Sequence, residues 1–118
     1  MSDARPTTGT PTAPAVDLAT DGPDVGLRHL QATIRATYGD RDRSRGVDAA
    51  LGWFIEEVGE LSRAVRRQGH DQRVVEFSDV MAWLVTLADL TGVDLATAMD
   101  RYTDGCPRCA ARPCTCEE

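Results

Sequence analysis

Residues 71–91 read DQRVVEFSDVMAWLVTLADLT, and this stretch carries the strongest evidence for the fold class. Large apolar side chains recur from residue 74 to residue 90 on every side of a helical axis. A helix that is apolar all round must be covered all round, and three shorter helices would not achieve this alone. We therefore expect an all-α protein whose four-helix bundle is completed by homo-oligomerisation, as an obligate homodimer or a higher oligomer such as a homotetramer.

The preceding helix is expected over residues 48–68, with Gly69 just past its end. Its apolar side chains form one stripe, which consists of Leu51, Phe54, Ile55, Val58, Leu61 and Val65. Gly59 lies in the middle of this helix, where glycine costs about 1 kcal/mol relative to alanine. Close approach by another element would explain this glycine, and simple tolerance of it is the alternative.

Two further helices flank this pair. Apolar residues spaced by three, four and four positions predict a first helix over residues 27–38, with Asp24 as its N-cap. Residues 39–46 are expected to form a charged connection to the second helix. The fourth helix is expected to be capped by Asp94 and to run to about Tyr102.

A chain of 118 residues suits one domain, which we place at residues 24–104. Residues 1–23 are expected to be a disordered N-terminal segment, because they have too few large apolar groups to offset the entropy of ordering. They also lack the pattern of a secretory signal. No stretch approaches the roughly 20 apolar residues of a membrane span, so we expect a cytoplasmic protein with no membrane partner. Residues 105–118 form a Cys-rich tail.

The charge balance is acidic, with 19 acidic against 13 basic residues and a net charge of −6. Proteins that bind nucleic acid normally present a basic face to the phosphates. The balance therefore argues against a nucleic-acid partner.

Five carboxylates carry the expected chemistry. Glu56, Glu57 and Glu60 are neighbours on the second helix, and Glu76 and Asp79 are i,i+3 neighbours on the third. A hairpin between these helices would set the two groups facing each other. Two carboxylates about 4 Å apart repel by roughly 4 kcal/mol at an effective dielectric near 20, so a converging group calls for cations or raised pKa values. Hard cations such as Mg²⁺ and Mn²⁺ prefer oxygen ligands.

A plainer interpretation exists for the second helix. Its three glutamates alone would suit a solvated face, with Arg63 and Arg67 as salt partners. Glu76 and Asp79 lie in an otherwise apolar helix, where an unpaired buried charge would be very costly. They shift the balance toward a metal site.

The strings EEVGEL at residues 56–61 and EFSDV at residues 76–80 resemble the EExxE and ExxD signature of MazG-like nucleoside-triphosphate pyrophosphohydrolases. The resemblance covers about residues 27–102. It implies a MazG-like helical domain that hydrolyses a nucleoside triphosphate, NTP or dNTP, to the monophosphate and pyrophosphate with Mg²⁺ or Mn²⁺.

The resemblance also implies roles for individual carboxylates. Glu57, Glu60, Glu76 and Asp79 would be the Mg²⁺ ligands. Glu56 would be catalytic, either as a further ligand or by orienting the attacking water, whose proton a nearby carboxylate can accept.

Candidate substrate contacts outside the carboxylate group are few. Arg101 stands where such proteins often carry a lysine, so it is a candidate phosphate contact, with a surface arginine as the alternative. Trp53 is a weaker candidate for stacking on the base, whereas Trp83 is expected in the core or an oligomer interface. Asp89 stands where the resemblance implies asparagine.

The tail carries a second candidate metal site. Cys106, Cys109, Cys114 and Cys116 supply four thiolates within a short loop, enough for a tetrahedral Zn²⁺ site. Such a site would be structural, since four protein ligands leave no place for substrate. The alternative is a reduced tail without metal.

Two other functions remain open. One is a related all-α hydrolase of another phosphoanhydride, such as phosphoribosyl-ATP or a dUTP-like substrate. The other is a non-catalytic helical dimerisation module with a zinc-bound tail. Mg²⁺-dependent release of pyrophosphate would separate the enzyme from the module.

Overall fold

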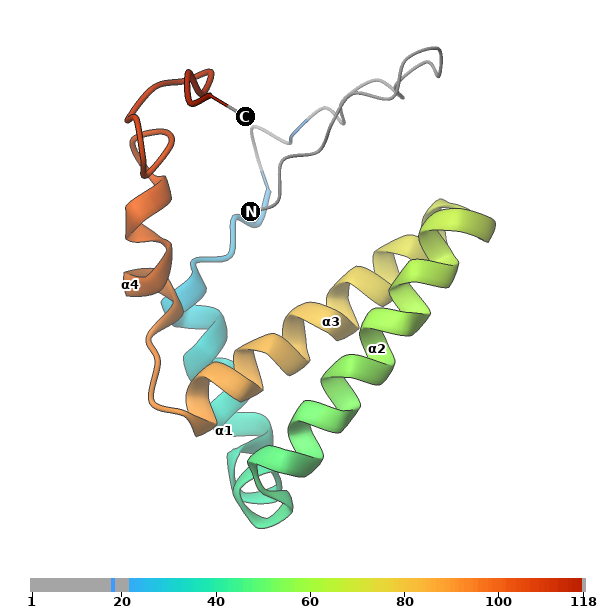
Figure 1. Cartoon of the computed structure of the whole chain (residues 1–118). Helices are drawn as coiled ribbons and strands as arrows, with labels where there is room; N and C mark the ends of the chain where they lie inside the picture. Colours follow the sequence, from blue (N-terminus) through green and yellow to red (C-terminus); the bar gives the residue numbers. More distant parts are fainter. Residues whose placement is uncertain (1–17, 19–21, 118) are drawn as a thin grey trace.

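The computed structural model describes residues 18 and 22–117, and this part of the chain is helical without strands (Figure 1). The helices are α1 (Leu27–Arg45), α2 (Val47–Arg67), α3 (His70–Leu90) and α4 (Leu95–Met99), followed by the 3₁₀ helix η1 (Asp100–Tyr102). The prediction of an all-α fold is confirmed. The predicted disorder of residues 1–23 falls almost wholly on residues outside the described part.

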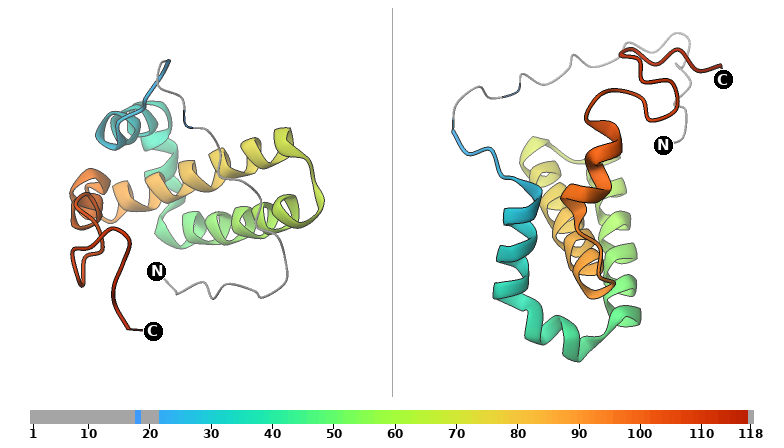
Figure 2. Two further views of the ribbon diagram at one scale, coloured as in Figure 1. Left: turned by 90° about the horizontal axis from the view of Figure 1, so that it is seen from above. Right: turned by 90° about the vertical axis from the view of Figure 1, so that its left-hand side faces the viewer.

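Helices α2 and α3 form an antiparallel hairpin that dominates the molecule (Figure 1). Gln68 and Gly69 connect them, and Gly69 is the N-cap of α3. Helix α1 packs mainly against α3, and α4 lies beside α1 (Figure 2). The hairpin therefore holds the two carboxylate-bearing helices side by side, while α1 covers part of α3.

Helix α1 is longer than the sequence predicted. Residues 39–46 were expected to be a connection, but the helix continues to Arg45 and breaks only at Gly46, where φ is +89°. The Arg43 guanidinium meets Asp40 at 2.6 Å, and such i,i+3 pairs stabilise helices. The charges that suggested a loop are the polar surface of the last turns of α1.

One predicted cap is confirmed and one is wrong. Asp94 caps α4, since its Oδ1 accepts a hydrogen bond from the Ala96 N–H at 3.0 Å. Asp24 does not cap α1, because the N-cap is Gly26, which offers no side-chain acceptor. Gly92, at φ +76°, lets the chain leave α3 in a left-handed conformation that favours glycine.

The apolar core of the described chain is small. Its buried apolar side chains are Ala50, Ala64, Val85 and Ala88, of which only Val85 is larger than alanine. Many large apolar side chains on the hairpin are exposed, including Leu51, Ile55, Val58, Val65, Val74, Val75, Phe77, Met81 and Leu84. A Cβ at Gly59 would meet nothing within 4 Å, so no described element of this chain approaches it closely.

Polar contacts tie α1 to the end of α3 and the segment after it. The buried Gln31 amide donates to the Val93 carbonyl at 2.8 Å and accepts from the Leu95 N–H at 3.0 Å. Arg35 donates to Asp89 at 2.7 Å, which accounts for the aspartate at a position where asparagine was expected. These bonds fix the position of α1 against α3.

Among the described residues, no single helix has both the length and the apolar composition needed to cross a membrane. Helix α3 and the segment Leu95–Tyr102 meet that test only as a pair bent by 108°.

Candidate active site

Three of the five predicted carboxylates converge across the hairpin. Glu57 projects from α2, and Glu76 and Asp79 project from α3 one turn apart, so all three reach the same space. A carboxylate oxygen from each lies within 4.8 Å of the other two. This group, the carboxylate cluster, can hold a metal ion.

Glu76 provides the strongest reason to expect a cation there. The residue is only 8% exposed, and its Oε1 accepts a hydrogen bond from Gln72 Nε2 at 2.7 Å. Its Oε2 is buried without a hydrogen-bond partner. A buried unpaired carboxylate oxygen is costly, and a hard cation bound by oxygen ligands would satisfy it. The donor set therefore fits a divalent metal.

The electrostatics of Glu57 agree with this assignment. Its pKa is raised above the ordinary value, first by burial and then by the negative charges of Asp79, Glu76, Glu60 and Glu56. Like charges at close range disfavour ionisation, and a bound cation reverses that effect.

Glu56 and Glu60 lie at the exposed edge of this cluster. Glu60 approaches Arg63 at 3.9 Å, an exposed i,i+3 pair that matches the plainer interpretation of α2. Both glutamates are close enough to contribute to the raised pKa of Glu57. In the structure, Glu56 and Glu60 therefore lie next to the cluster but are not part of it.

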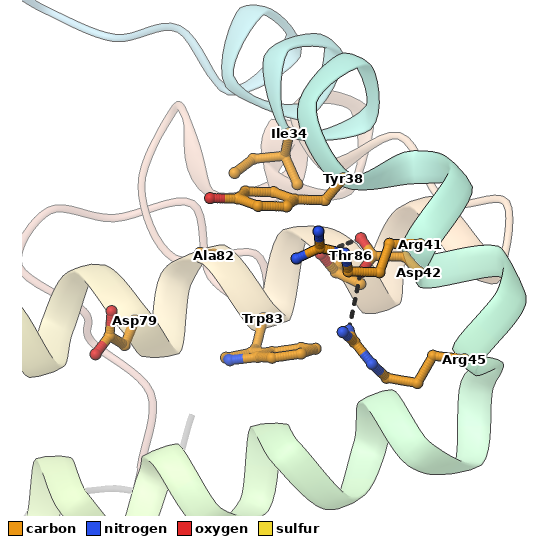
Figure 3. A pocket seen from close by; sticks show the side chains of 9 residues that line it. All are labelled: Ile34, Tyr38, Arg41, Asp42, Arg45, Asp79, Ala82, Trp83 and Thr86. Carbon is orange, nitrogen blue, oxygen red and sulfur yellow. Dashed lines mark hydrogen bonds and ion pairs between the residues drawn. The ribbon is translucent and has the colours of Figure 1, made fainter.

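A cavity of about 280 Å³ adjoins the cluster, between α1 and α3. It is lined by Ile34, Tyr38, Arg41, Asp42, Arg45, Asp79, Ala82, Trp83 and Thr86. The rings of Tyr38 and Trp83 lie on opposite sides of it, with Asp79 toward one end (Figure 3). Asp79 belongs to both the cavity and the carboxylate cluster, so the two are continuous.

The cavity contains a buried carboxylate that the sequence reasoning missed. Asp42 is 5% exposed and accepts hydrogen bonds from Thr86 Oγ1 and Arg45 Nη1, each at 3.1 Å (Figure 3). A signal for it existed, because the spacing that leads to Tyr38 continues by four residues to Asp42 and three more to Arg45. All three residues line the same side of the cavity.

The two tryptophans stack on each other. The Trp53 and Trp83 ring centroids are 6.1 Å apart with an interplanar angle of 11°, and the Arg45 guanidinium lies 5.1 Å from the Trp83 ring centre. Trp83, expected in the core or an interface, is a wall of the cavity. Trp53 stacks against that wall without lining the cavity itself.

Arg101 lies with the tail. It is part of η1, and its guanidinium lies over the Tyr102 ring at 5.2 Å. It also lines a second cavity of about 640 Å³ with Cys106, Cys114 and Cys116. The phosphate contact expected of Arg101 stays a prediction.

The four cysteines form the second group that can hold a metal. All four Sγ atoms lie within 4.8 Å of one another. Hydrogen bonds from the backbone N–H groups of Thr115 and Ala111 lower the pKa of Cys109 to about 5. Hydrogen bonding among the crowded sulfur atoms, with Cys114 first, raises the pKa of Cys116 to about 12.

The helical hairpin, the carboxylate cluster and the adjoining cavity define an all-α protein with a candidate divalent-metal site beside a ligand-sized cavity. The model of the MazG nucleotide pyrophosphohydrolase domain matches residues 45–108, more than half of the chain. The chain belongs to this family, whose members are hydrolases that typically use a divalent metal. No curated protein matches the chain in a direct comparison.

Proposed function

We propose that this protein hydrolyses nucleoside triphosphates, NTP or dNTP, to the nucleoside monophosphate and pyrophosphate with Mg²⁺ or Mn²⁺. One observation carries the proposal beyond family membership: Asp79 belongs to both the carboxylate cluster and the cavity. A nucleotide bound with its phosphates at the cluster would have its base and sugar in the cavity.

Glu57, Glu76 and Asp79 would hold the metal, and Glu60 would join them as a fourth ligand by turning toward the cluster. A divalent metal there would supply neutralisation of the phosphate charge and a lower pKa for a bound water. Glu56 orients that water and accepts its proton on a carboxylate oxygen. The water oxygen bonds to one phosphorus of the α–β anhydride, and the bridging oxygen leaves with the other.

The cavity accommodates the nucleoside. Its volume is near the lower end for ligand pockets, which suits a base with its sugar. Tyr38 and Trp83 offer ring faces on opposite sides of that space (Figure 3). Trp53 stacks on Trp83 but is not part of the cavity lining. Arg41 and Arg45 add positive charge to an otherwise acidic neighbourhood. The contacts between these side chains and the nucleoside would determine which base and sugar the protein prefers.

The protein acts as a homodimer or homotetramer in the cytoplasm. Support for the assembly comes from the hairpin, where Ile55 is 61% and Phe77 57% exposed. Apolar patches of this kind mark interaction sites, and a second hairpin packed on the first would complete a four-helix bundle. The acidic net charge supports the absence of a nucleic-acid partner.

The decisive experiment incubates the purified protein with each NTP and dNTP, with phosphoribosyl-ATP and with dUTP, with and without Mg²⁺. Monophosphate and pyrophosphate are both measured. We expect metal-dependent release of both from at least one nucleoside triphosphate. Absence of release from every substrate would leave the non-catalytic dimerisation module as the better account.

A matched pair of variants tests the site. Asp79→Asn removes a carboxylate of the cluster, and we expect at least about a 100-fold loss of turnover, which corresponds to about 2.7 kcal/mol of lost transition-state stabilisation. Asp71→Asn makes the same change in the first turn of α3, outside the cluster, and should keep near-normal turnover. Equal activity in the two variants would remove the site assignment.

A further inference from the structure

The tail has a defined path without an apolar core to hold it. Residues 105–117 contain no leucine, isoleucine, valine or aromatic side chain. The backbone is nevertheless folded back on itself, since the Cys106 N–H donates to the Ala111 carbonyl at 3.2 Å and the Ala110 N–H to the Cys106 carbonyl at 2.7 Å. Segments that cannot bury apolar surface need another source of order, and bound metal is a common one.

The positions of the sulfur atoms match one tetrahedral ion. Cys106 and Cys116 have their Sγ atoms 3.8 Å apart, and so do Cys109 and Cys114. A tetrahedral site with Zn–S bonds of about 2.3 Å has S–S edges of about 3.8 Å. The two pairs are not disulfides, in which the sulfurs are about 2.05 Å apart. Cysteines that bind an iron–sulfur cluster attach to different irons, whereas these four Sγ atoms all lie within 4.8 Å of one another, close enough to share one ion.

Backbone donors stabilise three of the four sulfurs as thiolates. The Arg108 N–H donates to Cys106 Sγ and the Thr115 N–H to Cys109 Sγ, each at 3.4 Å. The Cys116 N–H donates to Cys114 Sγ at 3.3 Å. Hydrogen bonds of this kind orient metal ligands and disperse their charge. Arg108 and Arg112 line the surrounding cavity and offset the double negative charge of a four-thiolate Zn²⁺ site.

We propose that residues 105–117 bind one Zn²⁺ through Cys106, Cys109, Cys114 and Cys116 in a closed structural site. Each thiol loses its proton on binding, and the ion holds the tail in the folded path described above. The matched family domain ends at residue 108, so three of the four ligands lie beyond it. The site is therefore an addition to the hydrolase domain, and it leaves no position open for substrate.

The first test measures metal and thiols in the purified full-length protein. We expect about one zinc per chain, released by a thiol-specific reagent in step with modification of the four cysteines. The double variant Cys109→Ser, Cys114→Ser should contain no zinc but keep the helical content. Asp79→Asn, which alters the carboxylate cluster and the adjoining cavity but not the tail, should keep its zinc.

Two further measurements report on geometry and folding. The Co²⁺-substituted protein should show the intense visible and thiolate charge-transfer bands of a tetrahedral four-sulfur site. Trypsin should cleave the Arg108–Cys109 bond at least about tenfold faster after zinc is removed, because the metal no longer holds this segment folded.

Several outcomes would overturn the proposal. Four reactive thiols without zinc, two disulfides, or iron in place of zinc would each do so. Retention of full zinc by the double cysteine variant would assign the ion to other residues. These readouts do not depend on catalysis, so they stand whether or not the protein hydrolyses nucleotides.

Discussion

Glu57 and Glu76 show how the site depends on single side chains. Glu76 has one oxygen bonded to Gln72 and the other buried without a partner. Glu57 faces this group from the opposite helix, and its pKa is raised by burial and by its acidic neighbours. Without a cation, the repulsion between these carboxylates destabilises the folded protein at neutral pH. With a cation bound, the same carboxylates act as its ligands.

The raised pKa of Glu57 predicts the direction of a pH effect. A carboxylate whose folded pKa lies above its unfolded value contributes stability below the unfolded pKa, and loses it as pH rises through the folded pKa. In metal-free protein, Glu57→Gln should therefore raise the melting temperature slightly at pH 7 and have little effect below about pH 4. The melting-temperature gain from Mg²⁺ should shrink in this variant.

Thermal unfolding at several pH values, with and without Mg²⁺, provides this measurement. Asp104→Asn, which removes a carboxylate outside both metal groups, is the control and should keep the full Mg²⁺ gain. If Mg²⁺ raised the melting temperature of the Glu57→Gln protein as much as that of the wild type, the assignment of Glu57 as a metal ligand would be contradicted.

Ala110 carries backbone strain that a single substitution can relieve. Its φ is +63°, a left-handed conformation that costs an L-residue roughly 1–2 kcal/mol. Ala110→Gly should therefore strengthen zinc retention in a chelator competition by about 1 kcal/mol, or roughly fivefold. Ala110→Val, whose branched side chain tolerates this conformation poorly, should weaken retention. An opposite order of the three proteins would contradict the described loop.

At the scale of elements, α1 and α3 enclose the cavity through one buried polar contact. Asp42 on α1 accepts from Thr86 on α3 and from Arg45 within its own helix. Arg45 in turn lies against the ring of Trp83. The contact positions the α1 wall of the cavity relative to the α3 wall.

Two similar ion pairs on α1 provide a matched test of that contact. Asp42→Ala should destabilise the protein by about 1–3 kcal/mol, because it leaves Thr86 and Arg45 without their acceptor in a buried place. Asp40→Ala removes the exposed partner of Arg43 and should change stability by less than about 0.5 kcal/mol.

Chemical denaturation measures both effects. The Asp42 variant should also show a higher KM for the nucleotide, because the wall of the cavity has lost its support. Equal stabilities for the two variants would mean that the contact of Asp42 with Thr86 and Arg45 does not stabilise the packing of α1 on α3.

The sequence predicted most of this architecture but not the cavity. Periodicity and caps located α2, α3 and α4, and the hairpin explained why Glu57 meets Glu76 and Asp79. The end of α1 was misplaced because Gly39 and the dense charges suggested a loop, although in the structure they are helical. The cavity arises from the packing of α1 on α3, and local patterns do not specify how two helices pack.

At the scale of the whole molecule, exposed apolar surface predicts association. The buried apolar core of the described chain is small, while the α2–α3 hairpin exposes a long apolar face. We expect a dimer or tetramer by light scattering at micromolar concentration. Ile55→Glu places a charge on that face and should shift the protein toward monomer.

Ala36→Glu places the same charge on α1 and serves as the control, which should leave the assembly unchanged. A wild-type protein that is monomeric across this concentration range would contradict the proposed bundle. An Ile55→Glu protein that assembles normally would place the interface elsewhere.

Phosphorus NMR of a nucleoside triphosphate incubated with the protein and Mg²⁺ identifies which phosphoanhydride bond is cleaved, and therefore tests the proposed reaction itself. We expect pyrophosphate and nucleoside monophosphate in equal amounts, with no diphosphate intermediate. Inorganic phosphate and nucleoside diphosphate as the first products, or unchanged triphosphate for every base, would contradict it.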